Sequence, residues 1–138
     1  VYGAWGRPDM AYYKFINKII NGKSIKVYNN GNHSRSFTYI DDVIKAISLL
    51  LIEYKNKNDF NEVYNIGGGV SIALNDFIKI IEQICNKSSK KKFIEIQNGD
   101  VKHASADCTK IFNKIKFKPN TKIEEGLKIF YDWYLNYI

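Results

Sequence analysis

Cysteine and histidine are scarce in this sequence, with two of each among 138 residues. Cys85 and Cys108 form no Cys-x-x-Cys pair, and neither they nor His33 and His103 have the spacing of zinc ligands. The sequence therefore predicts no metal site. Reduced thiols in a cytoplasmic protein are the simplest interpretation of the two cysteines.

Long apolar runs are lacking as well. The longest, from Val43 to Ile52, is interrupted by Lys45 and Ser48 and is far shorter than a membrane span. No charged segment followed by an apolar one marks a secretory signal, so we expect a cytoplasmic location and no membrane partner. The sequence has neither a Gly-x-Ser-x-Gly elbow nor a Gly-x-x-x-x-Gly-Lys loop, and neither kind of active site is indicated.

Positive charge is in excess, because 21 Lys and Arg stand against 14 Asp and Glu, a formal net charge of +7. This balance suits nucleic acid, anionic lipid or a phosphorylated small molecule, or simply a lysine-rich surface. Lys90–Lys92 is the only run of lysines, and we expect it in a solvated loop. A nucleic-acid binder needs a clustered basic face with aromatic residues, so the scattered lysines argue against one.

Alternating helices and strands predict an α/β fold, and the length suits one domain. Apolar residues at helical spacing predict helices at Asp9–Ile20, Asp41–Tyr54, Leu74–Asn86, Asp107–Ile115 and Ile123–Tyr137, with Asp9 as an N-cap. Strands are predicted at Ser24–Tyr28, Ser36–Ile40, Val63–Ile66 and Phe93–Gln97.

A few residues have side chains suited to recognising a ligand. Arg7 and Arg35 are the only arginines, and a guanidinium fork suits phosphate or carboxylate; the alternative is two surface ion pairs. Tyr28 is suited to stacking on a base, or to closing a small core. Asp100 is suited to accepting hydrogen bonds from hydroxyls, or is an ordinary turn residue. The glycines at 67–69 form either a phosphate-binding loop or a turn.

Five sequence blocks follow one another along the whole chain: VYGAWGRPDMA (1–11), KVYNNG (26–31), RSFTYIDDV (35–43), YNIG (64–67), and QNGDV (97–101) followed by Ala106-Asp107. In this order they resemble UDP-glucuronate 4-epimerases of the extended short-chain dehydrogenase/reductase superfamily. The family usually has Pro where this chain has Ala4 and Asn98, and Asp where it has Ser36. The block with Arg7 favours uronate epimerases over other sugar-nucleotide enzymes.

The resemblance implies the fold and the cofactor. Residues 1–138 would be the C-terminal portion of a Rossmann-type NAD(P)-binding fold together with the small substrate-binding domain. The family's Gly-x-x-Gly-x-x-Gly loop, catalytic Ser/Thr and Tyr-x-x-x-Lys pair belong to an N-terminal half that is not in this sequence. We therefore expect no catalytic residue in this chain and NAD as the cofactor of the intact enzyme. Tyr2 and Gly3 match positions where the family's backbone passes the nicotinamide.

The resemblance also assigns five residues to the substrate. Arg35 matches the arginine on the UDP pyrophosphate, and Tyr28 matches the aromatic residue beside the uracil. Asp100 matches the acid that holds the ribose hydroxyls, and Gln97 aligns with a position near the phosphate. Arg7 matches the arginine near the sugar carboxylate, which indicates a uronate substrate.

The function implied is the interconversion of UDP-glucuronate and UDP-galacturonate by oxidation and re-reduction at carbon 4. The alternatives are another UDP- or dTDP-sugar epimerase, a decarboxylase or a 4,6-dehydratase of the same superfamily, or a non-catalytic binding fragment. The partners expected are a UDP-sugar and, for the intact enzyme, a second copy in a homodimer.

Overall fold

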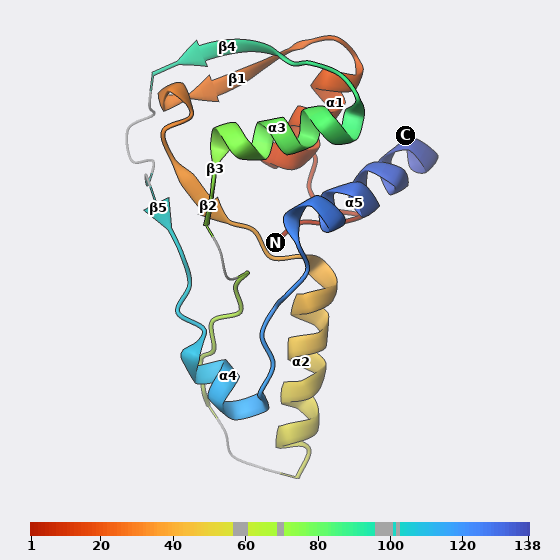
Figure 1. Cartoon of the computed structure of the whole chain (residues 1–138). Helices are drawn as coiled ribbons and strands as arrows, with labels where there is room; N and C mark the ends of the chain where they lie inside the picture. Colours follow the sequence, from red (N-terminus) through yellow and green to blue (C-terminus); the bar gives the residue numbers. More distant parts are fainter. Residues whose placement is uncertain (57–60, 69–70, 96–100, 102) are drawn as a thin grey trace.

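The computed structural model describes residues 1–56, 61–68, 71–95, 101 and 103–138 (Figure 1). In chain order its elements are α1 (Ala11–Ile20), β1 (Ser24–Tyr28), the 3-10 turn η1 (Asn29–Gly31), β2 (Ser34–Ser36), α2 (Ile40–Tyr54), β3 (Ser71–Ala73), α3 (Leu74–Cys85), β4 (Lys90–Ile94), β5 (His103–Ala104), α4 (Thr109–Ile115) and α5 (Ile123–Tyr137). This mixture of helices with parallel and antiparallel strand pairs confirms the predicted α/β class.

Two small sheets organise the chain. β1 pairs in parallel with β4, with Ser24 opposite Lys90 and Tyr28 opposite Ile94. In the second sheet β2 lies between β3, which is antiparallel to it, and β5, which is parallel. A single parallel bridge joins Tyr2 to Tyr39. These pairings bring together segments that are far apart in the sequence, with β2 as the central strand of the second sheet.

The core lies where α1, α3 and α5 meet beneath the β1 and β4 pair (Figure 1). Alternation along β1 directs Ile25 and Val27 inward, and both are fully buried. The apolar stripes of the three helices complete the cluster, and burial of each such side chain contributes about 1.5–3 kcal/mol. Its largest fully buried members include Tyr2, Tyr12, Ile16, Phe77, Ile78, Ile81, Leu127 and Phe130.

The other end of the molecule is built from α2, α4 and the segment that precedes β3 (Figure 1). Here a polar network accompanies a few buried apolar residues, Ala46 and Tyr54 on α2 and Ile111 on α4. The hydroxyls of Tyr54 and Tyr64 lie 2.6 Å apart, and both donate to the carboxylate of Glu62, at 3.2 and 3.0 Å. Lys110 from α4 pairs with Glu62 at 3.3 Å and lies over the Tyr64 ring. The network therefore fastens the end of α2 to α4.

All five predicted helices and the strand at Ser24–Tyr28 are present, whereas of the strand predicted at Phe93–Gln97 only Phe93 and Ile94 lie in β4 within the described residues. Residues 63–66 form no strand, whereas β3 and β5 were not predicted. The segment predicted as a strand at Ser36–Ile40 contains only the end of β2 and the Tyr39 bridge. Lys90–Lys92 lie in β4 rather than in a loop, with their backbones paired to β1 and their side chains exposed.

The start of α1 also differs from the prediction. Met10 is the N-cap residue, and no side chain caps the helix. The carboxylate of Asp9 is instead bound by the guanidinium of Arg7, two residues earlier. Either bond of this carboxylate would be charge-assisted, but the guanidinium fork binds both carboxylate oxygens at once and adds a second full charge, which favours the pair with Arg7.

Candidate functional site

Arg7 and Asp9 form a two-pronged ion pair before α1. Nε of Arg7 donates to Oδ1 of Asp9 at 2.9 Å, and Nη2 donates to Oδ2 at 2.5 Å. The pair holds the pKa of Asp9 below its usual value, mainly through the hydrogen bond from Arg7. Arg7 remains 77% exposed, so the far edge of its guanidinium faces solvent. This is the surface ion pair named as an alternative, and it leaves N–H donors available to a further anion.

Tyr28 lies at the end of β1 in the wall of a cavity of ≈ 410 Å³. Lys26, two residues earlier on the strand, projects on the same side and lines the same cavity. The other lining residues come from α1 and the segment just before it, from the turn before β2 and from the start of α3: Asp9, Ala11, Lys14, Phe15, Lys18, His33 and Leu74. The cavity thus combines two aromatic rings with three ammonium groups and one carboxylate.

The turn between Tyr28 and β2 is fixed by the start of α3. Asn29, Asn30 and Gly31 all have positive φ, of 48°, 51° and 78°, which is the conformation that Asn and Gly tolerate best. The side-chain amide of Asn75 donates to the backbone carbonyl of Asn30 at 3.2 Å, and the backbone N–H of Leu74 donates to the backbone carbonyl of His33 at 3.0 Å. These contacts set the direction in which the chain leaves Tyr28 for Arg35.

Arg35 is the middle residue of β2, the central strand of its sheet. Its neighbours across the ladder are Ile72 on β3 and Ala104 on β5. Nη1 of Arg35 donates to the carbonyl of Ser34 at 2.9 Å, and the side chain is half-buried. Strands on both sides hold the backbone here, so Arg35 is presented from a rigid element rather than a loop.

Tyr2 and Gly3, predicted to pass the nicotinamide, belong to the core. The backbone N–H of Tyr2 donates to the backbone carbonyl of Thr38 at 3.0 Å, and the carbonyl of Tyr2 accepts from the backbone N–H of Ile40 at 2.9 Å. The Tyr2 ring is 2% exposed, and burial raises the pKa of its hydroxyl, helped by the charge of Asp42. Gly3, at φ 150°, leaves no room for a β-carbon beside Ile40. A contact of these two residues with NAD stays a prediction.

Gln97 and Asp100, predicted to contact the phosphate and the ribose, lie outside the described residues. Of the glycines at 67–69, Gly68 is the informative one. Its N–H donates to the hydroxyl of Thr38 at 2.6 Å, and a β-carbon there would collide with the carbonyl of Phe37. The close approach to Phe37 explains why residue 68 is a glycine, and Gly69 lies outside the described residues.

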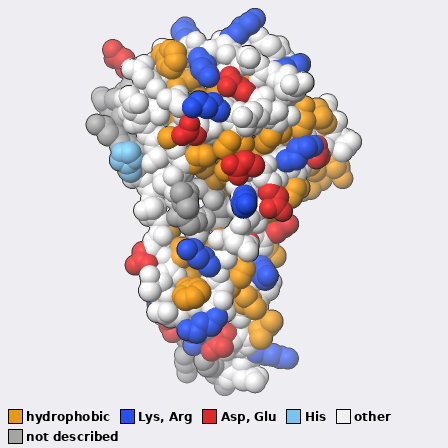
Figure 2. All heavy atoms as spheres, viewed as in Figure 1, with side chains coloured by type: hydrophobic (Ala, Val, Ile, Leu, Met, Phe, Trp, Pro, Cys, Tyr) orange, Lys and Arg blue, Asp and Glu red, His pale blue; other side chains and the backbone are white. Residues whose placement is uncertain are grey.

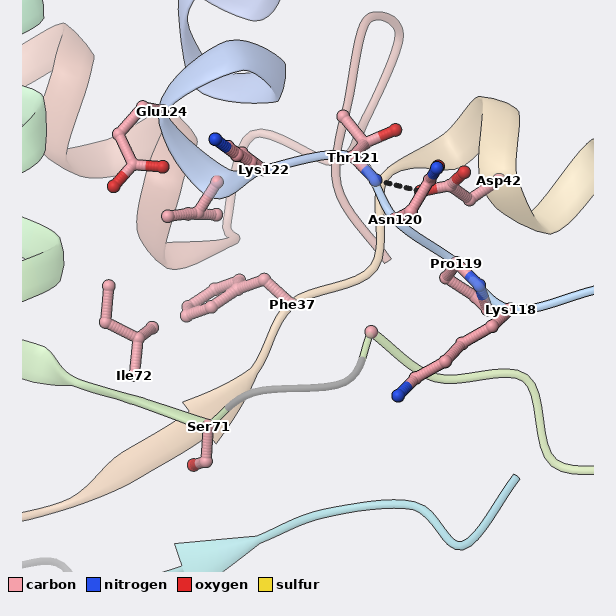
Figure 3. A pocket seen from close by; sticks show the side chains of 12 residues that line it. Phe37, Asp42, Ser71, Ile72, Lys118, Pro119, Asn120, Thr121, Lys122 and Glu124 are labelled. Carbon is pink, nitrogen blue, oxygen red and sulfur yellow. Dashed lines mark hydrogen bonds between the residues drawn. The ribbon is translucent and has the colours of Figure 1, made fainter. Parts of the chain in front are cut away.

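A larger cavity, of ≈ 570 Å³, lies between the end of β2 and the segment that leads into α5 (Figure 3). Asp42 is buried beside it and accepts a hydrogen bond from the N–H of Thr121 at 3.0 Å. Gly68, from the segment that could have been a phosphate-binding loop, lines this cavity, whereas Tyr2, Gly3, Arg7, Tyr28 and Arg35 do not. Further lining side chains are Phe37, Ser71, Ile72, Lys118, Asn120, Lys122 and Glu124.

Charge distinguishes the two cavities. In the larger one Lys118 and Lys122 are balanced by Asp42 and Glu124. In the Tyr28 cavity the carboxylate of Asp9 is outnumbered by the ammonium groups of three lysines, and its charge is already shared with Arg7. Among the described residues none of these lysines has a carboxylate within 4.0 Å. A dianionic ligand is therefore better accommodated at the Tyr28 cavity.

Lys14, Lys18 and Lys26 were not predicted as site residues. The sequence alone shows that Lys14 and Lys18 share one face of a helix and that Lys26 lies on the same side of its strand as Tyr28. It does not show that α1 packs beside the end of β1, which brings the three lysines to one cavity. On the face shown in Figure 2, by contrast, the Lys and Arg side chains of the described residues alternate with Asp and Glu.

The ranges that the structure describes contain neither a metal-binding cluster nor a membrane-spanning helix. No three side chains of His, Cys, Asp and Glu are grouped so as to hold a metal ion. None of the helices is both long enough and apolar enough to cross a membrane.

Comparison with known proteins gives a consistent result. Residues 1–67 match the family described as the NAD dependent epimerase/dehydratase family. An uncharacterised protein of Methanocaldococcus jannaschii is 47% identical over 98% of this chain and 40% of its own length. The UDP-glucuronate 4-epimerase of Thermodesulfobacterium geofontis is 38% identical over 96% of this chain and 40% of its own length.

Among solved structures, that of UDP-glucuronic acid 4-epimerase from Bacillus cereus, in complex with UDP-glucuronic acid and NAD, matches with a TM-score of 0.90. It is 33% identical in sequence, and the match covers 99% of this chain and 43% of that one. The chain thus spans less than half the length of each of these three proteins.

Proposed function

Because this chain belongs to the NAD dependent epimerase/dehydratase family, we propose that it is the nucleotide-sugar-binding part of a UDP-sugar 4-epimerase. The whole enzyme would interconvert UDP-glucuronate and UDP-galacturonate by oxidation and re-reduction at carbon 4, with NAD as cofactor. As in the relatives that it matches, this chain would account for less than half of such an enzyme.

The observation that carries the proposal is the cavity beside Tyr28. Its aromatic walls suit a flat base, and its three lysines raise the local potential for an anion. Its volume of ≈ 410 Å³ is in the range of small-molecule sites. A surface that only carries the solvating lysines of a basic protein would not need an aromatic wall at the same place.

The proposed role of Arg35 is to hold the pyrophosphate. A diphosphate offers pairs of oxygens that a guanidinium can bridge, and such charge-assisted bonds are about twice as strong as neutral ones. β2 lies between two paired strands, so little of the binding free energy is lost in ordering the backbone at Arg35. Gln97 and Asp100, outside the described residues, are proposed to complete the grip on phosphate and ribose.

The residues described here do not by themselves make a dinucleotide site. The backbone groups of Tyr2 are already bonded to Thr38 and Ile40, and its ring is buried. The carbonyl of Gly3 accepts from Gly6 and from the Tyr12 hydroxyl. We therefore derive no step of the reaction through NAD and assign no catalytic residue to this chain.

A second candidate function is another enzyme of the same family, acting on a different nucleotide-sugar. The carboxylate of a uronate can form a charge-assisted pair with the guanidinium of Arg7, whereas a neutral sugar offers it only hydroxyl groups. The open edge of Arg7 beside the Asp9 pair is the observation that favours the uronate over the alternatives. A homodimer of the intact enzyme is proposed from the resemblance alone.

The test is calorimetric titration of the chain with UDP. Arg35→Ala should weaken UDP binding by about 2 kcal/mol, because it removes a charge-assisted contact. Arg7→Ala is the matched control, since it removes the chain's other arginine and should leave UDP affinity nearly unchanged. Circular dichroism of both variants checks that they keep the overall secondary structure of the wild-type chain. Equal UDP affinities for the wild-type chain and Arg35→Ala would refute the assignment of Arg35.

A further inference from the structure

The outer side of the β1 and β4 pair carries a row of lysines. The parallel register places Lys26 opposite Lys92, and Lys90 stands two residues before Lys92 on the same side of β4. All three side chains are exposed. In the part of the chain that the structure describes, no carboxylate lies within 4.0 Å of their ammonium groups. Like charges directly opposite each other destabilise a ladder, so this row favours contact with an anion.

The inner side of β4 has a different character. Lys91 points toward α3 and pairs with Glu82 at 3.3 Å, so its charge is balanced. Phe93 follows on the same side of the strand, opposite Val27 in the register. Val27 is fully buried, whereas Phe93 is 56% exposed. The apolar layer that covers β1 thus does not extend over this part of β4, and the Phe93 ring remains an exposed apolar surface.

β4 also has an edge that no strand covers within the described residues. It is one of two strands in its sheet, and its backbone pairs with β1 alone. The peptide groups that point away from β1 are therefore available to a further strand. Glu95 comes after the last paired residue, so the paired length of the lysine row contains no carboxylate. The lysines repel β4 of a second copy, and only a strand with negative charge is favoured at this edge.

We propose that the free edge of β4 binds an extended peptide of another protein in which acidic and apolar residues alternate. A strand rises about 3.3 Å per residue and its side chains alternate between two sides, so acidic residues two positions apart match the spacing of Lys90 and Lys92. The residues between them face the other side and cover Phe93. Backbone hydrogen bonds to β4 provide affinity, and the alternating side chains provide selectivity.

This site is distinct from the proposed nucleotide site. Of the three lysines in the row only Lys26 lines the Tyr28 cavity, and neither Lys90 nor Lys92 does. The peptide would pair with the edge of β4 that faces away from β1. The proposal therefore does not depend on whether the chain binds a UDP-sugar.

Fluorescence polarisation with labelled synthetic peptides tests the proposal. A peptide of alternating Glu and Val should bind the chain, and a peptide with all Glu before all Val should bind about tenfold more weakly, because its charge is the same but its pattern is lost. Two methylated forms of the alternating peptide test the backbone pairing. One is methylated on every Glu nitrogen and the other on every Val nitrogen. In a strand these two sets of N–H groups face opposite edges, so only one of the two forms should lose binding.

Variants of β4 test the side chains. Replacing Lys90 and Lys92 together with Gln should weaken binding of the alternating peptide roughly five- to tenfold, the effect of two exposed ion pairs. Lys91→Gln is the matched control, because it removes the same charge from the same strand but on the side of Glu82, and it should change binding less than about twofold. Phe93→Thr should weaken binding about threefold, since it removes the apolar contact from an exposed position that Thr suits. Circular dichroism checks that each variant keeps the secondary structure of the wild-type chain.

Three results would overturn the proposal. The first is no binding of the alternating peptide, or equal binding of the alternating and block-ordered peptides. The second is equal weakening by Lys91→Gln and by the double variant, because β4 would then act only as a general positive charge. The third is tighter binding of single-stranded DNA with the same net charge as the peptide, which would assign the lysine row to a nucleic acid instead of a protein partner.

Discussion

The hydroxyl of Tyr2 lies against the backbone of Gly126 in the first turns of α5. A β-carbon at Gly126 would overlap this hydroxyl and come within 2.7 Å of the ring carbon that bears it. Within the described part of the chain the Tyr2 hydroxyl is buried and has no hydrogen-bond partner. Tyr2 thus joins the amino-terminal segment to α5 by packing alone.

Gly126→Ala should lower the free energy of unfolding by about 2–3 kcal/mol, because a core that is already filled must move to admit a methyl group. Helix propensity alone predicts the opposite sign, since Ala is favoured over Gly by up to about 1 kcal/mol. Tyr2→Phe should stabilise the chain by about 1 kcal/mol, because it removes a buried hydroxyl without a partner. Urea denaturation of the two variants and their combination measures the coupling. If Gly126→Ala costs as much with Phe at position 2, the contact with the hydroxyl does not set the cost.

The helices were predictable because their signal is local. Phe77, Ile78 and Ile81 recur at helical spacing, and all three are buried in α3 as that spacing requires. The short strands β3 and β5 could not be predicted in this way, because a strand of two or three residues is defined by the hydrogen bonds to its partner strand. Ser71–Ala73 and His103–Ala104 become strands by pairing with Ser34–Ser36, which is distant in the sequence. No local pattern marks such residues.

The candidate site divides in the same way. Arg7 and Arg35 were predicted as ligand-binding residues because they are the only arginines and because they match the family's motifs. In the structure Arg7 forms an ion pair with Asp9, and Arg35 lies on the central strand of its sheet. The basic cavity beside Tyr28 required knowledge of tertiary packing, because Lys14 and Lys26 come from separate elements. Asp9 shows the limit of local rules: it has the residue type of an N-cap, but Met10 is the N-cap residue and Arg7 binds the Asp9 carboxylate.

Stability should fall in alkaline solution, and Cys85 should account for part of the loss. Burial raises the pKa of its thiol from 9.0 to about 11. The unfolded chain therefore releases this proton at lower pH than the folded chain does. Its contribution is complete below pH 9 and is lost as pH rises through about 11. Burial raises the pKa values of Tyr2, Tyr12 and Tyr39 in the same direction.

The measurement is the free energy of unfolding in urea at steps between pH 8 and 11. Cys85→Ala should flatten the decline while lowering stability throughout, because it leaves a small cavity. Ile81→Val is a control that removes buried volume from the same helix without changing a titrating group, so it should keep the wild-type slope. Parallel curves for wild type and Cys85→Ala would show that the thiol does not contribute.

These 138 residues alone should not epimerise a UDP-sugar, even with NAD added. The described residues supply no dinucleotide site, and the resemblance places the catalytic tyrosine and lysine outside this sequence. The assay follows conversion of UDP-glucuronate to UDP-galacturonate by chromatography, with the Bacillus cereus enzyme as a positive control. Product above the level of a buffer blank would mean that the catalytic groups lie within this chain after all.

Arg7 should determine which sugar is preferred rather than how tightly the nucleotide is held. Asp9 occupies one edge of its guanidinium and the other faces solvent, so a uronate carboxylate can bind without breaking the ion pair. Arg7→Ala should weaken binding of UDP-glucuronate roughly 5- to 10-fold and leave UDP and UDP-glucose nearly unchanged. Arg7→Lys keeps the charge but loses the planar fork, so it should recover only part of the preference.

The measurement is calorimetric titration of each variant with the three ligands. Equal weakening of all three by Arg7→Ala would remove the argument for a uronate and favour an enzyme of neutral UDP-sugars, because a general positive charge does not distinguish a carboxylate on the sugar from the diphosphate that all three ligands share.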